Sequence, residues 1–334
     1  MDETRAGIFT HCRVFAEAAF DFSPAACVET RHRLDLESVI GRACCLSSVR
    51  TRRIRICTLC DCSSHKSRCA GRQGRPRSSG KSTTLYAALM TLSRPGIRIL
   101  TAEDPIEYIF EHVSQAEVNE HIGNTFANYL RAFLRHDPEV IMLGEIRDQE
   151  TAEMAFRALQ TGHLLLSTLH TNTASGSIAR SMDLKVDPNA VASSLIGVVG
   201  QRLVRQICDT CKAPYEPSRQ LLREFFGERP PHLRFYKGLG CQACNLTGYR
   251  GRLTIVELWV PSEDDIVLIN KCAPIEEIRA SARRNTISMA ENAWLRMRDG
   301  STSLEELVRM LPYDAIAEFR QQCRWQQEAV PVAA

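Results

Sequence analysis

The sequence contains no long apolar stretch, and its longest apolar runs are far shorter than the roughly 20 residues of a membrane-spanning helix. We therefore expect no direct membrane span, and any membrane association would be peripheral, through partners. A signal peptide is also lacking, which argues against an oxidising compartment for the 14 cysteines. Neither sign of charge dominates, since 42 Lys and Arg accompany 39 Asp and Glu. This balance does not by itself imply a nucleic-acid partner.

A complete phosphate-binding loop is lacking as well. In such a loop, glycines let backbone N–H groups turn toward the phosphates, a lysine neutralises charge and a hydroxyl binds Mg²⁺. The opening glycine would stand at position 75, where the chain has Arg75, and residues 63–77 are polar and basic where a strand is expected. The closing half is intact and leads into a predicted helix at residues 81–92, whose amino end would face the phosphates. Its predicted nucleotide-binding residues are Ser79, Gly80, Lys81, Ser82 and Thr83.

Two predicted strands end in carboxylates. The apolar residues 140–143 lead into Glu145, and the β-prone residues 96–101 lead to an acidic turn that begins with Glu103. Open α/β sheets bind ligands at the carboxyl ends of their strands, and a carboxylate there can hold Mg²⁺ and polarise an attacking water. We expect Glu103 and Glu145 to be catalytic, with Mg²⁺ held through Ser82 and Glu145. A solvated acidic turn is the alternative for Glu103.

A third apolar run, residues 164–169, has a histidine at each end. His170 ends the run, and we expect it to be a catalytic residue that contacts the γ-phosphate. His163 precedes the run and is the weaker candidate for nucleotide contact. The alternative for a lone histidine is a hydrogen-bonded packing role.

Two Cys-x-x-Cys pairs, Cys208 with Cys211 and Cys241 with Cys244, are separated by 29 residues. Each pair can present two sulfurs to one side of a tetrahedral metal ion, and four thiolates leave no position open for water. We therefore expect a structural Zn²⁺ site. Disulfides are the alternative, which the lack of a signal peptide disfavours.

Longer runs carry a resemblance to a known family. They are Gly-Lys-Ser-Thr-Thr-Leu-Tyr-Ala-Ala-Leu (80–89), Glu-Asp-Pro-Ile-Glu-Tyr (103–108), Leu-Arg-His-Asp-Pro-Glu-Val-Ile-Met-Leu-Gly-Glu-Ile-Arg-Asp (134–148), Thr-Gly-His-Leu-Leu-Leu-Ser-Thr-Leu-His-Thr-Asn (161–172) and Gln-Arg-Leu-Val-Arg (201–205). Over roughly residues 79–311 the chain resembles the ATPases of the type II secretion and type IV pilus family. The resemblance implies a RecA-like P-loop NTPase core in a hexameric ring, with ATP bound between subunits.

The resemblance also implies roles, partners and a location. Lys81 and Ser82 would form the end of the Walker A motif, Glu103 would lie in the aspartate box, Glu145 would be the Walker B acid, and His163 and His170 would form the histidine box. ATP turnover in the family drives filament assembly or retraction at the inner membrane, so the implied partners are inner-membrane platform proteins. The implied location is cytoplasmic and peripheral at that membrane. The cysteine module, followed by Thr-Gly-Tyr-Arg-Gly-Arg at 247–252, favours the assembly and secretion branch over retraction motors.

The first 77 residues do not fit this pattern. Between Gly41 and Arg77 there are ten Lys and Arg but one acid, Asp61, and no apolar periodicity that indicates a helix or strand. Eight of the 14 cysteines precede residue 80. Three hypotheses follow: a basic disordered arm for anionic lipid or nucleic acid, a second metal site, or a segment out of frame relative to an ancestral gene. We favour the third, because GC-rich DNA in a wrong frame tends to encode Arg, Cys, Ser and Gly.

We therefore expect an α/β chain in four parts. These are a degenerate segment, disordered or out of frame, at 1–77, a RecA-like ATPase core at 78–206, a zinc-binding tetracysteine module at 207–250 and a C-terminal helical region at 251–334. Further helices are expected at 151–160, 175–183, 188–206, 219–226, 275–284, 289–298 and 303–310. Ser303 and Glu306 form a predicted capping box.

The predicted function is that of an ATP-hydrolysing motor subunit for type II protein secretion or type IV pilus assembly. The altered loop could impair it. So could the lack of a recognisable N-terminal domain, which in the family supplies arginines to the neighbouring subunit's ATP, because an arginine in trans can contribute orders of magnitude to phosphoryl transfer. The alternative is a non-catalytic remnant or ring-interaction subunit without ATP turnover.

Overall fold

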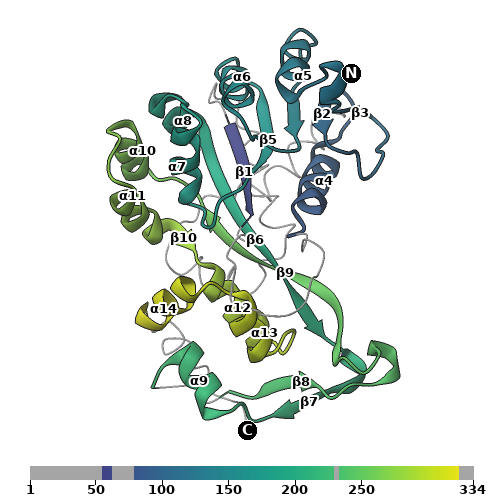
Figure 1. The fold of residues 1–334 in the computed structure, drawn as a ribbon, viewed down its shortest axis with the longest axis vertical. Coiled ribbons are helices and arrows are strands. Elements are labelled where there is room, and N and C mark those ends of the chain that lie inside the picture. Colours follow the sequence, from purple (N-terminus) through teal and green to yellow (C-terminus); the bar gives the residue numbers. More distant parts are fainter. Residues whose placement is uncertain (1–54, 62–78, 229–232, 323–334) are drawn as a thin grey trace, which may run out of the picture.

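The structure is a computed structural model that describes residues 55–61, 79–228 and 233–322 (Figure 1). Hypotheses on the basic arm, the second metal site and the altered frame concern residues 1–77, nearly all of which lie outside this range. One short strand from that segment is described.

Eight strands form the central sheet, and in spatial order they are β10 (Thr286–Ile287), β9 (Tyr249–Trp259), β6 (Leu195–Ile207), β1 (Arg55–Asp61), β5 (Leu164–Leu169), β4 (Val140–Leu143), β2 (Ile99–Glu103) and β3 (Val113–Glu117). From β6 to β3 all neighbours are parallel. β9 pairs antiparallel with β6, and β10 pairs antiparallel with β9. This confirms the predicted α/β class with a parallel sheet.

Helices cover both faces of the sheet (Figure 1). The parallel strands and the helices that cover them form the upper part of the molecule in Figure 1. These helices are α4 (Lys81–Leu92), α5 (Phe126–Phe133), α6 (Gln149–Gln160), α7 (Gly176–Asp183), α8 (Pro188–Ser194), α10 (Glu263–Asn270) and α11 (Ile275–Ala282), with a 3-10 turn η2 at Glu120–Ile122. The side chains of β4 alternate between the two layers, as a period of two requires. Val140 and Met142 pack with α4, whereas Ile141 and Leu143 belong to the core under the other helices.

The lower part of the molecule has a core of its own, rich in aromatic residues. Its elements are η3 (Asp209–Cys211), β7 (Lys212–Tyr215), α9 (Arg219–Phe226), β8 (Phe235–Gly238), η4 (Gln242–Cys244), η5 (Arg283–Asn285), α12 (Met289–Arg298), α13 (Leu304–Met310) and α14 (Tyr313–Gln322). Phe225 and Phe226 pack against Phe319 and Trp294 there. The long strands β6 and β9 run from the upper part into this lower part, so the two parts share one sheet (Figure 1).

Two sequence-based assignments need correction. The helix expected at 188–206 ends at Ser194, and the chain continues as strand β6. The β-branched Val198 and Val199 favour a strand, and both edges of β6 are paired, by β1 and β9. The segment from Gly41 to Arg77, where no strand was expected, contains β1 between β5 and β6. A short strand that pairs with another strand on each side gives little periodic signal in the sequence.

The region expected to be helical at 251–334 also begins with strand β9 and contains β10. The helices predicted at 151–160, 175–183, 219–226, 275–284, 289–298 and 303–310 are confirmed to within a few residues. Only half of the capping box forms: Ser303 Oγ accepts from the backbone N–H of Glu306, but the Glu306 carboxylate binds Arg205 and Arg309 instead. No helix among the described residues is long and apolar enough to cross a bilayer.

Candidate nucleotide site and cysteine cluster

The predicted site residues meet at one edge of the sheet. β2, β4, β5 and β1 are parallel, and their registers place Glu103, Glu145 and His170 at the same carboxyl edge. The register of β1 with β6 likewise places Asp61, the last residue of β1, level with Gln201 of β6. Ligands of open α/β sheets bind at this edge.

The closing half of the phosphate loop is anchored to this edge by Gln201, whose side chain is 1% exposed. Gln201 Nε2 donates to the carbonyl of Ser79 at 2.8 Å, and Thr84 Oγ1 donates to Gln201 Oε1 at 2.8 Å. Gly80 precedes α4 with φ +82°, and a Cβ there would lie 2.8 Å from Gln201 Nε2. Glycine is therefore required at this position for both its backbone angle and its size.

The amino end of α4 carries the other loop residues. Lys81 and Ser82 are partly buried, and Thr83 is exposed. Ser82 Oγ donates to Glu107 Oε1 at 3.3 Å. The first turn of α4 contains no acidic residue, so its N–H groups and positive dipole end keep their attraction for an anion.

Glu103 is buried and held by three donors. Its Oε1 accepts from Thr101 Oγ1 at 2.6 Å and from Gln115 Nε2 at 2.9 Å, and its Oε2 accepts from Tyr86. Burial and the hydrogen bond to Glu103 raise the pKa of Tyr86 to about 12. Since Tyr86 lies on α4, Glu103 ties this helix to the end of β2.

Glu145 forms a second group one strand away. Its carboxylate, 13% exposed, forms an ion pair with Arg147 and lies 3.0 Å from His170 Nε2. Arg147 Nη1 also lies 3.9 Å from Asp104 Oδ2, which joins this group to the turn after β2. The hydroxyl of Thr168 donates to the carbonyl of Gly144 at 2.7 Å and so fixes the start of the segment that carries Glu145.

The structure does not bring His163 to this edge. His163 precedes β5, so seven residues of extended chain, about 23 Å, separate it from His170. Its Nδ1 lies 2.9 Å from the carbonyl oxygen of Ala158 and 2.9 Å from Thr161 Oγ1. Within one chain its hydrogen bonds are therefore local, of the kind expected for a packing residue.

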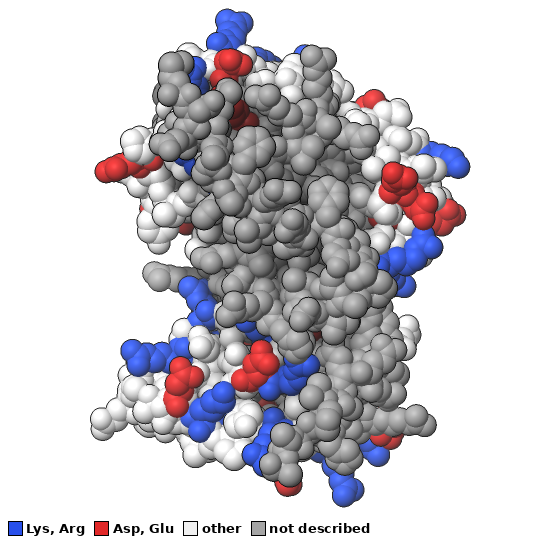
Figure 2. Space-filling view, turned by 180° about the vertical axis from the view of Figure 1, so that it is seen from behind, with Lys and Arg blue, Asp and Glu red and all other residues white. Residues whose placement is uncertain are grey.

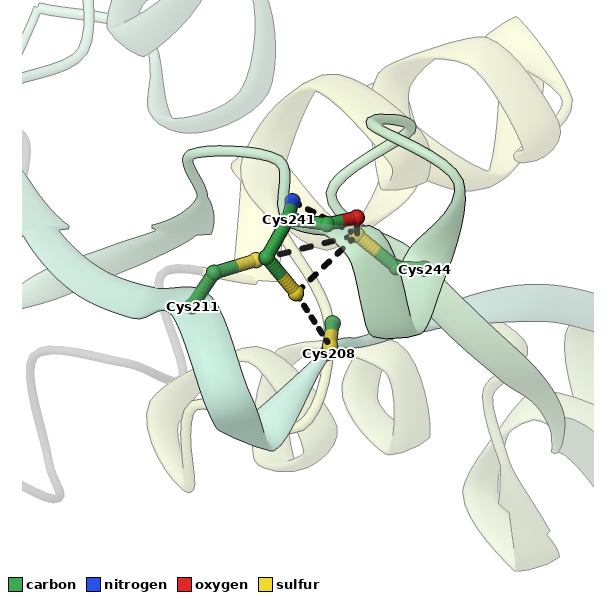
Figure 3. Close-up of side chains that lie close together, drawn as sticks. All are labelled: Cys208, Cys211, Cys241 and Cys244. Atoms are coloured by element: carbon green, nitrogen blue, oxygen red, sulfur yellow. Dashed lines mark hydrogen bonds between the residues drawn. The ribbon is translucent and has the colours of Figure 1, made fainter.

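The four predicted metal ligands meet in the lower part of the molecule (Figure 3). All four sulfurs, of Cys208, Cys211, Cys241 and Cys244, lie within 4.8 Å of one another. Three of the Sγ–Sγ distances are 3.7, 3.8 and 3.8 Å. Thiolates about 2.3 Å from one tetrahedral centre would lie about 3.8 Å apart, so the spacing fits a tetrahedral metal ion. The disulfide alternative does not describe the structure, in which all four are free thiols.

Backbone N–H groups support the sulfurs. The amides of Cys241 and Gly248 lie 3.2 and 3.3 Å from the Sγ of Cys244. Burial alone raises the pKa of the Cys244 thiol, but these hydrogen bonds, together with those to the thiols of Cys241 and Cys211, lower it to about 6. Burial raises the pKa of Cys211 to about 11 despite a hydrogen bond from the amide of Gly240. The thiolate form is the metal ligand.

Three residues of the nucleotide edge stand in the runs that carry the family resemblance but had no predicted role: Gln201, Tyr86 and Arg147. Gln201 lies 122 residues from its partner Ser79, so only the strand register brings them together. Tyr86 stands in the run 80–89, where nothing in the sequence indicates a contact with Glu103. Arg147 follows Glu145 by two residues, and this opposite charge beside a predicted metal ligand was a usable signal.

Residues 74–309 match the family described as Type II/IV secretion system protein. The chain belongs to that family. The type II secretion system ATPase E of Vibrio cholerae is 45% identical over 235 residues, which cover 70% of this chain and 47% of the relative. The type IV pilus assembly ATPase PilB of Myxococcus xanthus is 42% identical over 238 residues, which cover 70% of this chain and 42% of the relative. The chain thus spans about half the length of these curated relatives.

Solved structures agree with this family. A crystal structure of the pilus retraction motor PilT with bound ADP is similar with a TM-score of 0.55 and 28% identity, over 78% of this chain and 62% of PilT. The ATPase DotB of Legionella pneumophila is similar with a TM-score of 0.53 at 19% identity, over 82% of this chain and 62% of DotB, and this likeness concerns the fold alone. The family is one of secretion and pilus ATPase motors.

Proposed function

We propose that the chain is an ATP-hydrolysing motor subunit that drives type II protein secretion or type IV pilus assembly. One observation carries the proposal: Gly80 and the amino end of α4 meet the carboxyl edge that bears Glu103, Glu145 and His170. Anion-binding backbone and acidic groups at one sheet edge suit a nucleotide and its metal ion. The ADP in the PilT structure supports a nucleotide as the ligand.

Each residue of this edge has a chemical task in the proposal. Gly80, Lys81 and Thr83 bind the phosphates through backbone N–H groups and the lysine charge. Ser82 and Glu145 offer a hydroxyl and a carboxylate oxygen, the hard donors that suit Mg²⁺. When bound, that ion supplies charge neutralisation on the phosphate oxygens.

Glu145 is also the residue that would orient and polarise the attacking water, and His170, 3.0 Å from its carboxylate, stands beside the position of the transferred phosphate. Glu103 contributes by position, since all three of its hydrogen bonds hold neighbouring side chains and one of these belongs to α4. His163 would act through packing within its own chain.

The cysteine cluster suits a structural Zn²⁺ ion. Cys208, Cys211, Cys241 and Cys244 form a closed set of four sulfurs with tetrahedral spacing. Four thiolates leave no place for a reactive water, so the ion would support the fold of this module.

The partners follow from the relatives. We infer a homo-hexameric ring at the cytoplasmic side of the inner membrane, in contact with platform proteins of the secretion or pilus system. The names of the relatives from Vibrio cholerae and Myxococcus xanthus support the secretion or pilus system, and the ring, its partners and its location are what the family resemblance implies.

Mg²⁺-dependent ATP hydrolysis by the purified chain tests the proposal. We expect Glu145→Gln to lower kcat at least about 100-fold, because the variant keeps the shape but loses the polarising carboxylate. Glu276→Gln, an exposed position in the first turn of α11, is the matched control and should leave kcat unchanged. Hydrolysis that Glu145→Gln leaves intact would refute the assigned site, and a wild-type chain that binds but does not hydrolyse ATP would refute motor activity.

A further inference from the structure

The loop that carries the second cysteine pair, residues 239–248, presents two exposed leucines. Leu239 precedes this pair and Leu246 follows it, and they are 68% and 77% exposed. Their backbones are adjacent: a Cβ built on Gly240 would lie 2.8 Å from the carbonyl oxygen of Leu246. The amide of Leu239 donates to the carbonyl of Cys211, and that of Leu246 to the carbonyl of Cys241. Both leucines are thus fixed to the cysteine cluster.

The backbone of Leu246 is unusual, because its φ is +60°. A bulky residue in the left-handed region is uncommon and costs conformational energy. The preceding Asn245, with φ +50°, is of a type that tolerates this region, but leucine is not. An apolar side chain held in solvent at a strained position indicates an interaction surface.

The segment that carries the two leucines has charges of one sign. Arg234, Lys237, Arg250 and Arg252 are exposed, and residues 233–252 contain no Asp or Glu. Within the described part of the chain, none of these four forms an ion pair with a carboxylate, and Lys237 lies over the ring of Tyr215 instead. The nearest acids along the chain are Glu228 and Glu257. The exposed Asp209 of η3 lies two residues before Cys211. Figure 2 shows Lys and Arg side chains, with fewer Asp and Glu, on the lower part of the molecule.

We propose that this surface, formed by Leu239, Leu246 and the four basic residues, binds an anionic lipid bilayer. Aliphatic side chains enter the boundary between headgroups and acyl chains, while flanking Lys and Arg attract the anionic headgroups. Contacts between proteins are instead centred on Trp, Tyr and Arg, and leucine is under-represented among their strongest residues. The composition of this surface therefore favours lipid over an acidic protein segment, and the inference does not depend on ATP hydrolysis.

Binding to vesicles tests this inference with the full chain. We expect the protein to float with vesicles that contain about 30% phosphatidylglycerol but not with pure phosphatidylcholine, and to be released as salt rises from about 50 to about 500 mM. The double variant Leu239→Ser with Leu246→Asn should lower the partition coefficient at least about tenfold, because two apolar side chains no longer insert. Asn suits the left-handed backbone at position 246.

Two further variants make the test specific. Ile122→Ser changes another exposed apolar residue, 70% exposed in η2 between β3 and α5, and should bind like the wild type. Arg250→Gln with Arg252→Gln should weaken binding and its salt dependence. Metal content measured in each variant ensures that the cysteine cluster is intact. The inference is overturned if the leucine variant binds like the wild type or if Ile122→Ser loses as much. It is also overturned if the leucines matter only for binding an acidic protein partner and vesicles do not bind.

Discussion

At the scale of single residues, the carboxylates of this chain differ in what surrounds them. Glu103 is enclosed by donors from three elements, whereas the two partners of Glu145, Arg147 and His170, have side chains that are 58% and 55% exposed. A carboxylate that is satisfied by buried protein donors is suited to hold structure. One whose partners lie at the surface can exchange them for a ligand.

Replacing Glu103 should therefore affect stability. Glu103→Ala leaves the buried hydroxyl groups of Tyr86 and Thr101 without their acceptor and should lower the free energy of unfolding by about 2–4 kcal/mol. Glu103→Gln, which retains an acceptor, should cost less. Urea denaturation of both variants measures this, and equal stability of Glu103→Ala and the wild type would contradict the assigned role.

Glu257 offers a test through pH. It lies on β9, its Oε1 accepts from the amide of Ala174 at 3.2 Å, and burial raises its pKa from 4.5 to about 7. The folded state then holds the proton more tightly than the unfolded state, so the free energy of unfolding falls as pH rises from about 4.5 to about 7. We expect Glu257→Gln to remove this dependence.

The size of the change in the free energy of unfolding follows from the shift in the pKa of Glu257. At pH 8, Glu257→Gln should be more stable than the wild type by about 3 kcal/mol, whereas at pH 4 the two should differ little. Urea denaturation at both pH values is the measurement. The Glu318→Gln variant, a neighbouring carboxylate that pairs with Arg283, provides the comparison. An unchanged pH dependence in Glu257→Gln would show that another group is responsible.

At the scale of elements, much of the site could be predicted and part of the fold could not. Strands β4 and β5 are apolar runs with chemical groups at their ends, so both the strands and the positions of Glu145 and His170 could be predicted. The pattern at 188–206 predicts one helix because its first part, α8, is helical and a single sequence does not show that β1 and β9 flank the remainder, which forms β6. The role of Gln201 depends on this pairing and was missed for the same reason.

Gln201 allows a prediction at this scale. Gln201→Ala removes both hydrogen bonds that join β6 to Ser79 and Thr84, and we expect a loss of about 2–3 kcal/mol in the free energy of unfolding. Nucleotide affinity should fall several-fold, because Gly80 is no longer fixed. Gln206→Ala, at a partly exposed position of the same strand, should change stability by less than about 0.5 kcal/mol. Calorimetric melting and nucleotide titration measure the two effects, and similar results for the two variants would contradict the anchoring role.

At the scale of the whole molecule, β6 and β9 connect the nucleotide edge to the cysteine cluster. Arg205 on β6 lies over the ring of Tyr249 at 3.9 Å and binds the buried Glu306 of α13. The first residue of the cluster, Cys208, follows β6 directly. The lower part of the molecule is thus held by one sheet, one aromatic core and the set of four sulfurs.

Metal removal tests how much the set of four sulfurs contributes to the stability of the lower part of the molecule. We expect one zinc ion per chain, and its removal by a chelator should lower the free energy of unfolding by at least about 3 kcal/mol, because binding free energy of a structural ion is folding free energy. Cys241→Ser should act similarly, whereas Cys272→Ser, an exposed free cysteine, is the control. Metal analysis with thermal unfolding is the measurement. A chain that contains no metal, or that is equally stable without it, would contradict the structural role.

The central claim is that the carboxyl edge of the sheet binds a nucleotide even though Arg75 stands where the loop glycine is expected. The most direct measurement is an equilibrium titration of Mg²⁺ and ATP into the wild type and Lys81→Ala. The account predicts saturable binding by the wild type and a Kd at least about tenfold weaker in the variant, equivalent to about 1.4 kcal/mol. No binding by the wild type, or equal affinity in both proteins, would contradict it.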